Sequence, residues 1–157
     1  MSDDALRELT ITRFIAAPPE VVYRVWTTRL GEWFAPKPWA TPEWDVELKP
    51  GGRFRTVMQG PDGPPMDNTG VFLDVEPNRR LVFTDAFAPG WAPQGPFMVV
   101  IVSFEPEGDG ARYTARVRHW TEEALKQHEG MGFHEGWGAV AGQLAALAEA
   151  EASAKAA

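Results

Sequence analysis

The chain contains no cysteine. This excludes disulfide bonds, thiolate metal sites and cysteine nucleophiles, and it suits a reducing compartment. Serine is also scarce, and none of Ser2, Ser103 and Ser153 lies in a Gly-x-Ser-x-Gly motif, so a serine hydrolase of that type is excluded. The longest apolar run, residues 97–102, is far too short to span a bilayer.

Basic residues are few. Fifteen Lys and Arg stand against 22 Asp and Glu, which gives a net charge of −7. Nucleic-acid binding normally needs a basic stripe that displaces counterions from phosphates, and anionic membrane surfaces attract basic clusters. We therefore expect neither partner. Residues 1–8 are acidic and polar and do not resemble a secretory signal, so we expect a cytoplasmic protein.

With 157 residues, the chain fits a single domain, residues 1–157, with a core at about 8–150. A chain of this length buries enough surface to need no metal or disulfide for stability. Seven Trp and nine Phe are many for this size. Large aromatic rings fill cores, but they also line apolar pockets.

Alternating apolar residues predict strands along most of the chain. Pro18 and Pro19 favour a short helix that runs to Thr27, and a proline-rich loop covers residues 30–42. Short turns join the later strands, which indicates antiparallel pairing. The expected strands are residues 8–15, 43–49, 53–59, 69–76, 80–87, 97–105 and 111–120.

The C-terminal third predicts helix. Thr121 resembles an N-cap, and a longer helix is expected from about residue 131 to 150. Its apolar residues recur at spacings of 4, 3, 4 and 3 along one face: Phe133, Trp137, Val140, Leu144 and Leu147. We expect the tail from Ala148 to fray.

The order of elements predicts an α+β fold. In it, a curved antiparallel sheet of about seven strands wraps around the long C-terminal helix, with one or two short helices after the first strand. A sheet curled around one helix rarely fills completely. We therefore expect a cavity near the N-terminal half of that helix.

Several ordered sequence blocks also resemble a known superfamily, the START-like or Bet v-like helix-grip proteins (SRPBCC). More narrowly, they are similar to bacterial homologues of the C-terminal domain of the heat-shock-protein-90 ATPase activator. The resemblance covers about residues 8–150 and implies the same fold, whereas its members serve many functions. The blocks are APPEVV (17–22), WFAP (33–36), DVELKPGGRF (45–54), MQGPDG (58–63), GVFLDVEP (70–77), RLVFT (80–84) and HEGMGFHEGW (128–137).

Two apparent motifs fail on inspection. The His-Glu pairs at 128–129 and 134–135 lack the second His at i+4 that a zinc protease requires. Gly136, Gly138 and Gly142 resemble a dinucleotide loop but lie inside a predicted helix, where we expect them to let the helix approach the sheet closely. No metal or cofactor site is predicted.

Carboxylates are the remaining catalytic candidates. Asp74 and Asp85 lie in otherwise apolar strands, where an inward-facing carboxylate could act as an acid or base. We favour instead an outward face, or ion pairs with an arginine (Arg53, Arg55, Arg116 or Arg118). The pattern does not decide which sheet face is concave, and no residue is assigned a catalytic role.

Aromatic and methionine side chains on converging segments predict a ligand pocket. His134 is included as a possible polar contact, although a structural role is favoured for it. The candidate pocket residues are Trp33, Phe34, Trp39, Phe54, Met58, Phe83, Phe87, Trp91, Met131, His134 and Trp137.

The leading functional hypothesis is the binding or carriage of a small hydrophobic or aromatic ligand by a non-enzymatic monomer or homodimer. The resemblance also implies two alternatives. One is a polyketide cyclase-like enzyme, which would need polar pocket residues such as Asp74, Asp85, Tyr113 or His119. The other is a chaperone-regulating interaction protein, which a solid core would favour.

Overall fold

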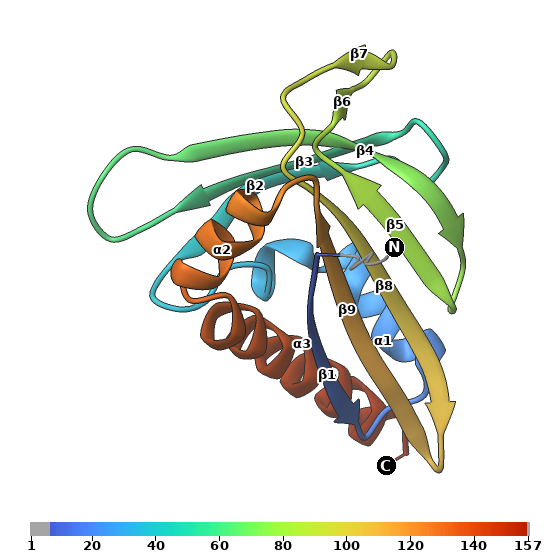
Figure 1. Ribbon diagram of the computed structural model, residues 1–157. Coiled ribbons are helices and arrows are strands. Elements are labelled where there is room, and N and C mark those ends of the chain that lie inside the picture. Colours follow the sequence, from blue (N-terminus) through green and yellow to red (C-terminus); the bar gives the residue numbers. More distant parts are fainter. Residues whose placement is uncertain (1–6, 157) are drawn as a thin grey trace.

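A seven-stranded antiparallel sheet curls around a long C-terminal helix (Figure 1). The computed structural model describes residues 7–156. The strands follow the order β1-β9-β8-β5-β4-β3-β2 across the sheet, so the meander from β2 to β9 closes against β1. The predicted helix-grip fold is confirmed. Its strands are β1 (Glu8–Ile15), β2 (Ala40–Val46), β3 (Arg53–Gln59), β4 (Met66–Glu76), β5 (Arg80–Thr84), β8 (Met98–Glu107) and β9 (Gly110–His119).

The helices are α1 (Pro19–Thr28), the 3-10 turn η1 (Leu30–Glu32), α2 (Glu122–Gly130) and α3 (Phe133–Ala156). Proline fits the first turn of α1 because the N–H that it lacks would have no partner there. The Thr121 side chain accepts a hydrogen bond from the Ala124 N–H at 3.0 Å and caps α2, as predicted.

Several predicted strands have different limits; β4, for example, begins at Met66 and not at residue 69. The strand expected at 80–87 ends at Thr84, whose hydroxyl donates to the Met98 carbonyl and accepts from the Ala86 N–H. The chain then leaves the sheet and forms a separate hairpin of β6 (Phe87–Ala88) and β7 (Ala92–Pro93) (Figure 1). The strand expected at 43–49 runs instead from 40 to 46, because residues 47–52 hydrogen-bond locally as a turn.

The C-terminal tail does not fray where we predicted. Helix α3 continues through Ala156, and Ala148 is fully buried. Glu149 accepts a hydrogen bond from the Ala16 N–H, and Glu151 pairs with Arg24 and Arg29 at 2.8 Å each. These contacts tie the last turns of α3 to the start of the chain.

The predicted apolar face of α3 packs into the core. Phe133 and Leu144 are buried, and Trp137, Val140 and Leu147 pack against the core while remaining partly exposed. The prediction that glycines allow close helix–sheet packing was wrong: a methyl group at Gly136 or Gly138 would meet no neighbouring atom within 4 Å. The small residues that enter the core are alanines, namely Ala141, Ala145 and Ala148.

Within residues 7–156, no helix combines the length and the apolar character that a membrane crossing requires.

Candidate functional site

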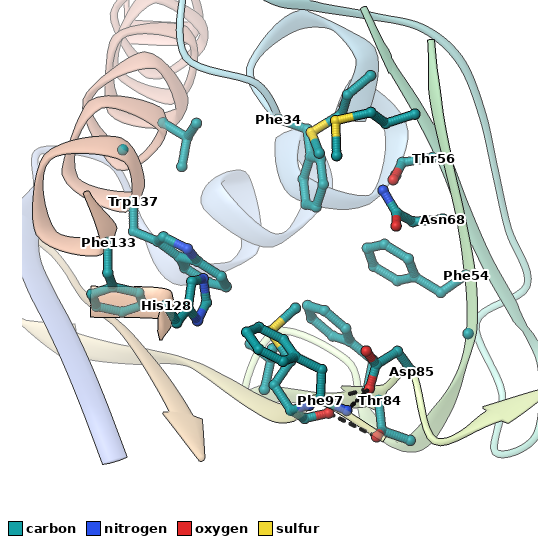
Figure 2. Close-up of a pocket in the computed structure, with 18 of the residues that line it drawn as sticks. Phe34, Phe54, Thr56, Asn68, Thr84, Asp85, Phe97, His128, Phe133 and Trp137 are labelled. Atoms are coloured by element: carbon teal, nitrogen blue, oxygen red, sulfur yellow. Dashed lines mark hydrogen bonds between the residues drawn. The ribbon is translucent and has the colours of Figure 1, made fainter. Parts of the chain in front are cut away.

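A cavity of about 700 Å³ lies between the concave face of the sheet and the N-terminal half of α3. Figure 2 shows Trp137, Phe133 and His128 on its helical wall, with Phe54, Thr56 and Asn68 on the strand side. Met66 and Met131 are the most exposed of its large apolar lining residues and mark where it opens to solvent. Seven of the predicted pocket residues line it: Trp33, Phe34, Phe54, Met58, Phe83, Met131 and Trp137.

Four predicted residues, Trp39, Phe87, Trp91 and His134, are not part of the lining. Trp39 covers Gly60, and Phe87 packs edge-on against Trp91 in the β6–β7 hairpin, with ring centroids 5.7 Å apart. Because β5 ends at Thr84, the chain leaves the sheet before the hairpin, and Phe87 and Trp91 lie away from the concave face. His134 is exposed on α3, 3.9 Å from Glu129.

The cavity also contains residues that were not predicted for it. Thr56 could have been found, because it alternates with Phe54 and Met58 on one strand face. Phe133 could have been found on the apolar face of α3. His128 and Asn68 give no such signal, because their positions depend on how α2 and β4 approach the cavity. Further lining residues not predicted as ligand contacts include Met66, Thr69, Thr84, Phe97, Met98 and Val140.

Paired aromatic rings form much of the wall. Phe133 stacks on Trp137 with centroids 5.1 Å apart, and Phe54 stacks on Phe83 at 4.4 Å. Deeper in the cavity, the Trp26 indole donates a hydrogen bond to the Tyr113 hydroxyl at 3.3 Å. Burial raises the pKa of Tyr113, so this hydroxyl stays protonated at neutral pH.

The two candidate carboxylates lie in different environments. Asp85 borders the cavity, and its Oδ1 accepts hydrogen bonds from the backbone N–H groups of Phe97 at 2.9 Å and Met98 at 3.2 Å (Figure 2). Asp74 instead forms an ion pair with Arg80, which lowers the pKa of its carboxyl group. The favoured ion pair for Asp74 therefore exists, but with an arginine that was not among the expected partners.

A buried pair of histidines lies at the helical wall. His119 ends β9 and His128 lies in α2, and their Nε2 and Nδ1 atoms are 2.9 Å apart. His128 borders the cavity, whereas His119 lies behind it. Burial and the neighbouring His119 lower the pKa of His128 to about 4, so this ring is neutral at pH 7.

Sequence comparison identifies the family. The profile of the family described as "Activator of Hsp90 ATPase homolog 1-like protein" matches residues 16–149. The chain belongs to this family. The predicted resemblance is therefore confirmed over residues 16–149, which contain every strand of the sheet after β1 and most of α3.

Solved structures of similar proteins agree with this assignment. A Nitrosomonas europaea protein is 42% identical, with a TM-score of 0.90, and the match covers 94% of this chain and 97% of that one. A Mycobacterium smegmatis protein is 26% identical, with a TM-score of 0.76 and 90% of each chain covered. An AHSA1 protein from Silicibacter pomeroyi, at 24% identity and a TM-score of 0.71, shares the fold over 92% of this chain and 99% of its own. Among curated proteins, none matches.

The residues of this family member do not form a metal site: within the described range 7–156, no group of three His, Asp or Glu side chains is arranged to hold an ion.

The lowered pKa of His128 predicts a loss of stability in mild acid. Its pKa falls from an ordinary 6.5 to about 4 on folding, so between these values the unfolded chain binds more protons than the folded one. The stability that the neutral His128 ring contributes is fully present above about pH 6.5, declines as the pH falls, and is lost near pH 4. Each pH unit below 6.5 costs about 1.4 kcal/mol until the lower value is reached, so we expect the free energy of unfolding to fall by about 2–3 kcal/mol between pH 7 and pH 4.5.

Urea unfolding of the wild type and His128→Phe between pH 7 and pH 4.5 measures this effect. The carboxylates titrate in both proteins, so the difference between the two curves isolates the His128 contribution. His134→Gln is the matched control, because it replaces an exposed histidine outside the cavity lining. A His128→Phe curve parallel to the wild type would contradict the prediction.

Proposed function

We propose that the protein binds a small, largely apolar molecule with an aromatic body in the cavity under the N-terminal half of α3. The observation that carries the proposal is the cavity itself, about 700 Å³ of space bordered mainly by aromatic and aliphatic side chains. Protein interiors pack densely and leave few voids larger than a water molecule. Ligand pockets, by contrast, have this size and this mainly apolar lining.

The family supports the same interpretation, because proteins of this superfamily fold commonly bind hydrophobic ligands. The ligand could be stored or carried as well as bound, and a monomer or homodimer would suffice, because a single chain provides all the lining residues named here. The proposed contacts are the seven predicted residues at the cavity, together with Phe97, His128 and Phe133. Trp39, Phe87, Trp91 and His134 are not included.

Trp137→Ala should weaken the binding of an aromatic ligand by about 10- to 100-fold, the range expected when an aromatic anchor is truncated. Trp137 lies on the cavity wall, stacked on Phe133, and is only partly buried, so folding should suffer less than binding. Calorimetric titration with a panel of aromatic compounds gives the affinity, and thermal melts give the stability.

Trp91→Ala is the matched control. It removes the same side chain from an exposed position outside the cavity lining, where Trp91 is 52% exposed, and it should leave the affinity unchanged. Equal losses of affinity in the two variants would contradict the assigned site. If no compound in the panel binds or raises the melting temperature of the wild type, the binder proposal fails.

The cyclase-like alternative has one specific observation in its favour: Asp85 and Tyr113 border the cavity. Asp74 no longer supports it, because that carboxylate forms an ion pair with Arg80. Conversion of a bound polyketide-like compound by the wild type, lost in Asp85→Asn, would establish the enzyme. The chaperone-regulating alternative was tied to a solid core, and the cavity at α3 removes that argument for it.

A further inference from the structure

The buried histidine pair has an orientation that can be worked out from its partners. His119 Nδ1 lies 3.0 Å from the backbone carbonyl oxygen of Arg7, and its Nε2 lies 2.9 Å from His128 Nδ1. The side chains are 5% and 8% exposed. The Phe97 ring packs against both imidazoles, with centroids 5.5 Å from His119 and 5.1 Å from His128.

Both rings are neutral in this setting. The hydrogen-bond partners that the structure gives them within residues 7–156 are each other and the Arg7 carbonyl, with no carboxylate among them. A buried charge without a paired opposite charge costs several kcal/mol. Each ring therefore carries a single N–H.

The Arg7 carbonyl determines which ring nitrogen of each histidine carries the hydrogen. A carbonyl oxygen only accepts, so His119 Nδ1 must be the donor, and His119 Nε2 is left with a lone pair. The 2.9 Å contact then requires His128 Nδ1 to donate to that lone pair. His128 Nε2, on the other side of the ring, is consequently a hydrogen-bond acceptor.

This acceptor is available to a molecule in the cavity. His128 borders the cavity, and Nε2 makes no hydrogen bond to the described part of the chain. It is also absent from the fully enclosed polar atoms without partners, which are Trp33 Nε1 and Thr41 Oγ1. Phe133 and Trp137 pack edge-on against the imidazole, with centroids 5.1 and 5.9 Å away, so the acceptor lies beside the aromatic wall (Figure 2).

We propose that His128 Nε2 accepts a hydrogen bond from a hydroxyl group on the aromatic ligand, so that the site selects phenols over the same ring system without a donor. His119 is a positioning residue, because its lone pair holds the His128 tautomer in the accepting form. A phenolic hydroxyl is a neutral donor and forms a strong hydrogen bond with a neutral imidazole, so neither partner brings an unpaired charge into the cavity. This inference rests on the proposed ligand binding at the same site.

Three probes with one ring system test the inference: 2-naphthol, 2-methoxynaphthalene and naphthalene. Wild-type protein should bind 2-naphthol about tenfold more tightly than 2-methoxynaphthalene, since one net hydrogen bond is worth about a factor of ten. His128→Phe should lose that preference while retaining naphthalene. His134→Phe, at the exposed histidine, should behave as the wild type.

A second measurement needs no variant. In protein with ¹⁵N-labelled histidine, long-range ¹H–¹⁵N correlations should show His119 and His128 as neutral Nδ1–H tautomers. Addition of 2-naphthol should shift the His128 Nε2 resonance, and addition of 2-methoxynaphthalene should not. This readout distinguishes a hydrogen-bonding role of the pair from a purely structural one.

The outcomes separate the two proposals. A naphthol preference that persists in His128→Phe, or an Nε2–H tautomer of His128 in the wild type, overturns this inference while naphthalene binding keeps the ligand site intact. Equal affinity of the wild type for 2-naphthol and 2-methoxynaphthalene overturns it in the same way. If none of the three compounds binds the wild type, the ligand proposal fails, and this inference fails with it.

Discussion

Replacing Leu144 with alanine is expected to lower the free energy of unfolding by about 2–5 kcal/mol, the usual cost of truncating a fully buried leucine. Leu144 lies midway along α3 with no exposed surface, in the core cluster that joins the helix to β1 and α1. Truncation removes apolar contacts and leaves a void that the surrounding sheet cannot close fully. Chemical denaturation at pH 7 provides the measurement.

Leu48→Ala is the control for this experiment. The same side-chain atoms are removed from a residue that is 40% exposed in the turn after β2, where the change should stay within about 0.5 kcal/mol. If Leu144→Ala also lost less than about 0.5 kcal/mol, the apolar face assigned to α3 would be incorrect.

Gly70→Ala should destabilise the protein by about 3 kcal/mol, at the upper end of what overpacking costs. Gly70 lies in β4, opposite Phe54 of β3. A methyl group there would collide with the Thr84 backbone carbonyl oxygen, at the end of β5. Because the clash is with backbone, it can be relieved only if the strands separate, which would also displace Thr84 and Asp85 at the cavity.

Gly138→Ala makes the same chemical change, but we expect it to raise the free energy of unfolding. This glycine lies inside α3, and an added methyl group would meet no neighbouring atom within 4 Å. Alanine favours the helix by about 0.5–1 kcal/mol over glycine, so the variant should be more stable than the wild type. Denaturation curves of the two variants side by side test both predictions, and a stability of Gly70→Ala equal to the wild type would contradict the close packing of β4 and β5.

The candidate site could be predicted from the sequence only in part. Phe54, Met58 and Trp137 were predictable because each lies on a regular element whose period fixes which side chains share a face. Phe87 and Trp91 were misplaced because the end of β5 depends on non-local hydrogen bonds, namely those of Thr84 to Met98 and of Asp85 to Phe97. A strand pattern that continues in sequence carries no information about such partners.

The sequence by itself determined the fold class, the family and the apolar face of α3, because hydrophobic periodicity, turn residues and ordered sequence blocks are local properties. Tertiary structure alone decided that Asp74 faces Arg80 and solvent while Asp85 faces the cavity, since the curvature of the sheet selects its concave side. It also decided that His119 and His128, nine residues apart in sequence, share a hydrogen bond whose direction is set by a carbonyl 112 residues away from His119. The sequence specifies which side chains are present, but the partners that fix the His128 tautomer and hydrogen-bond to Asp85 come from elements that meet only when the chain has folded.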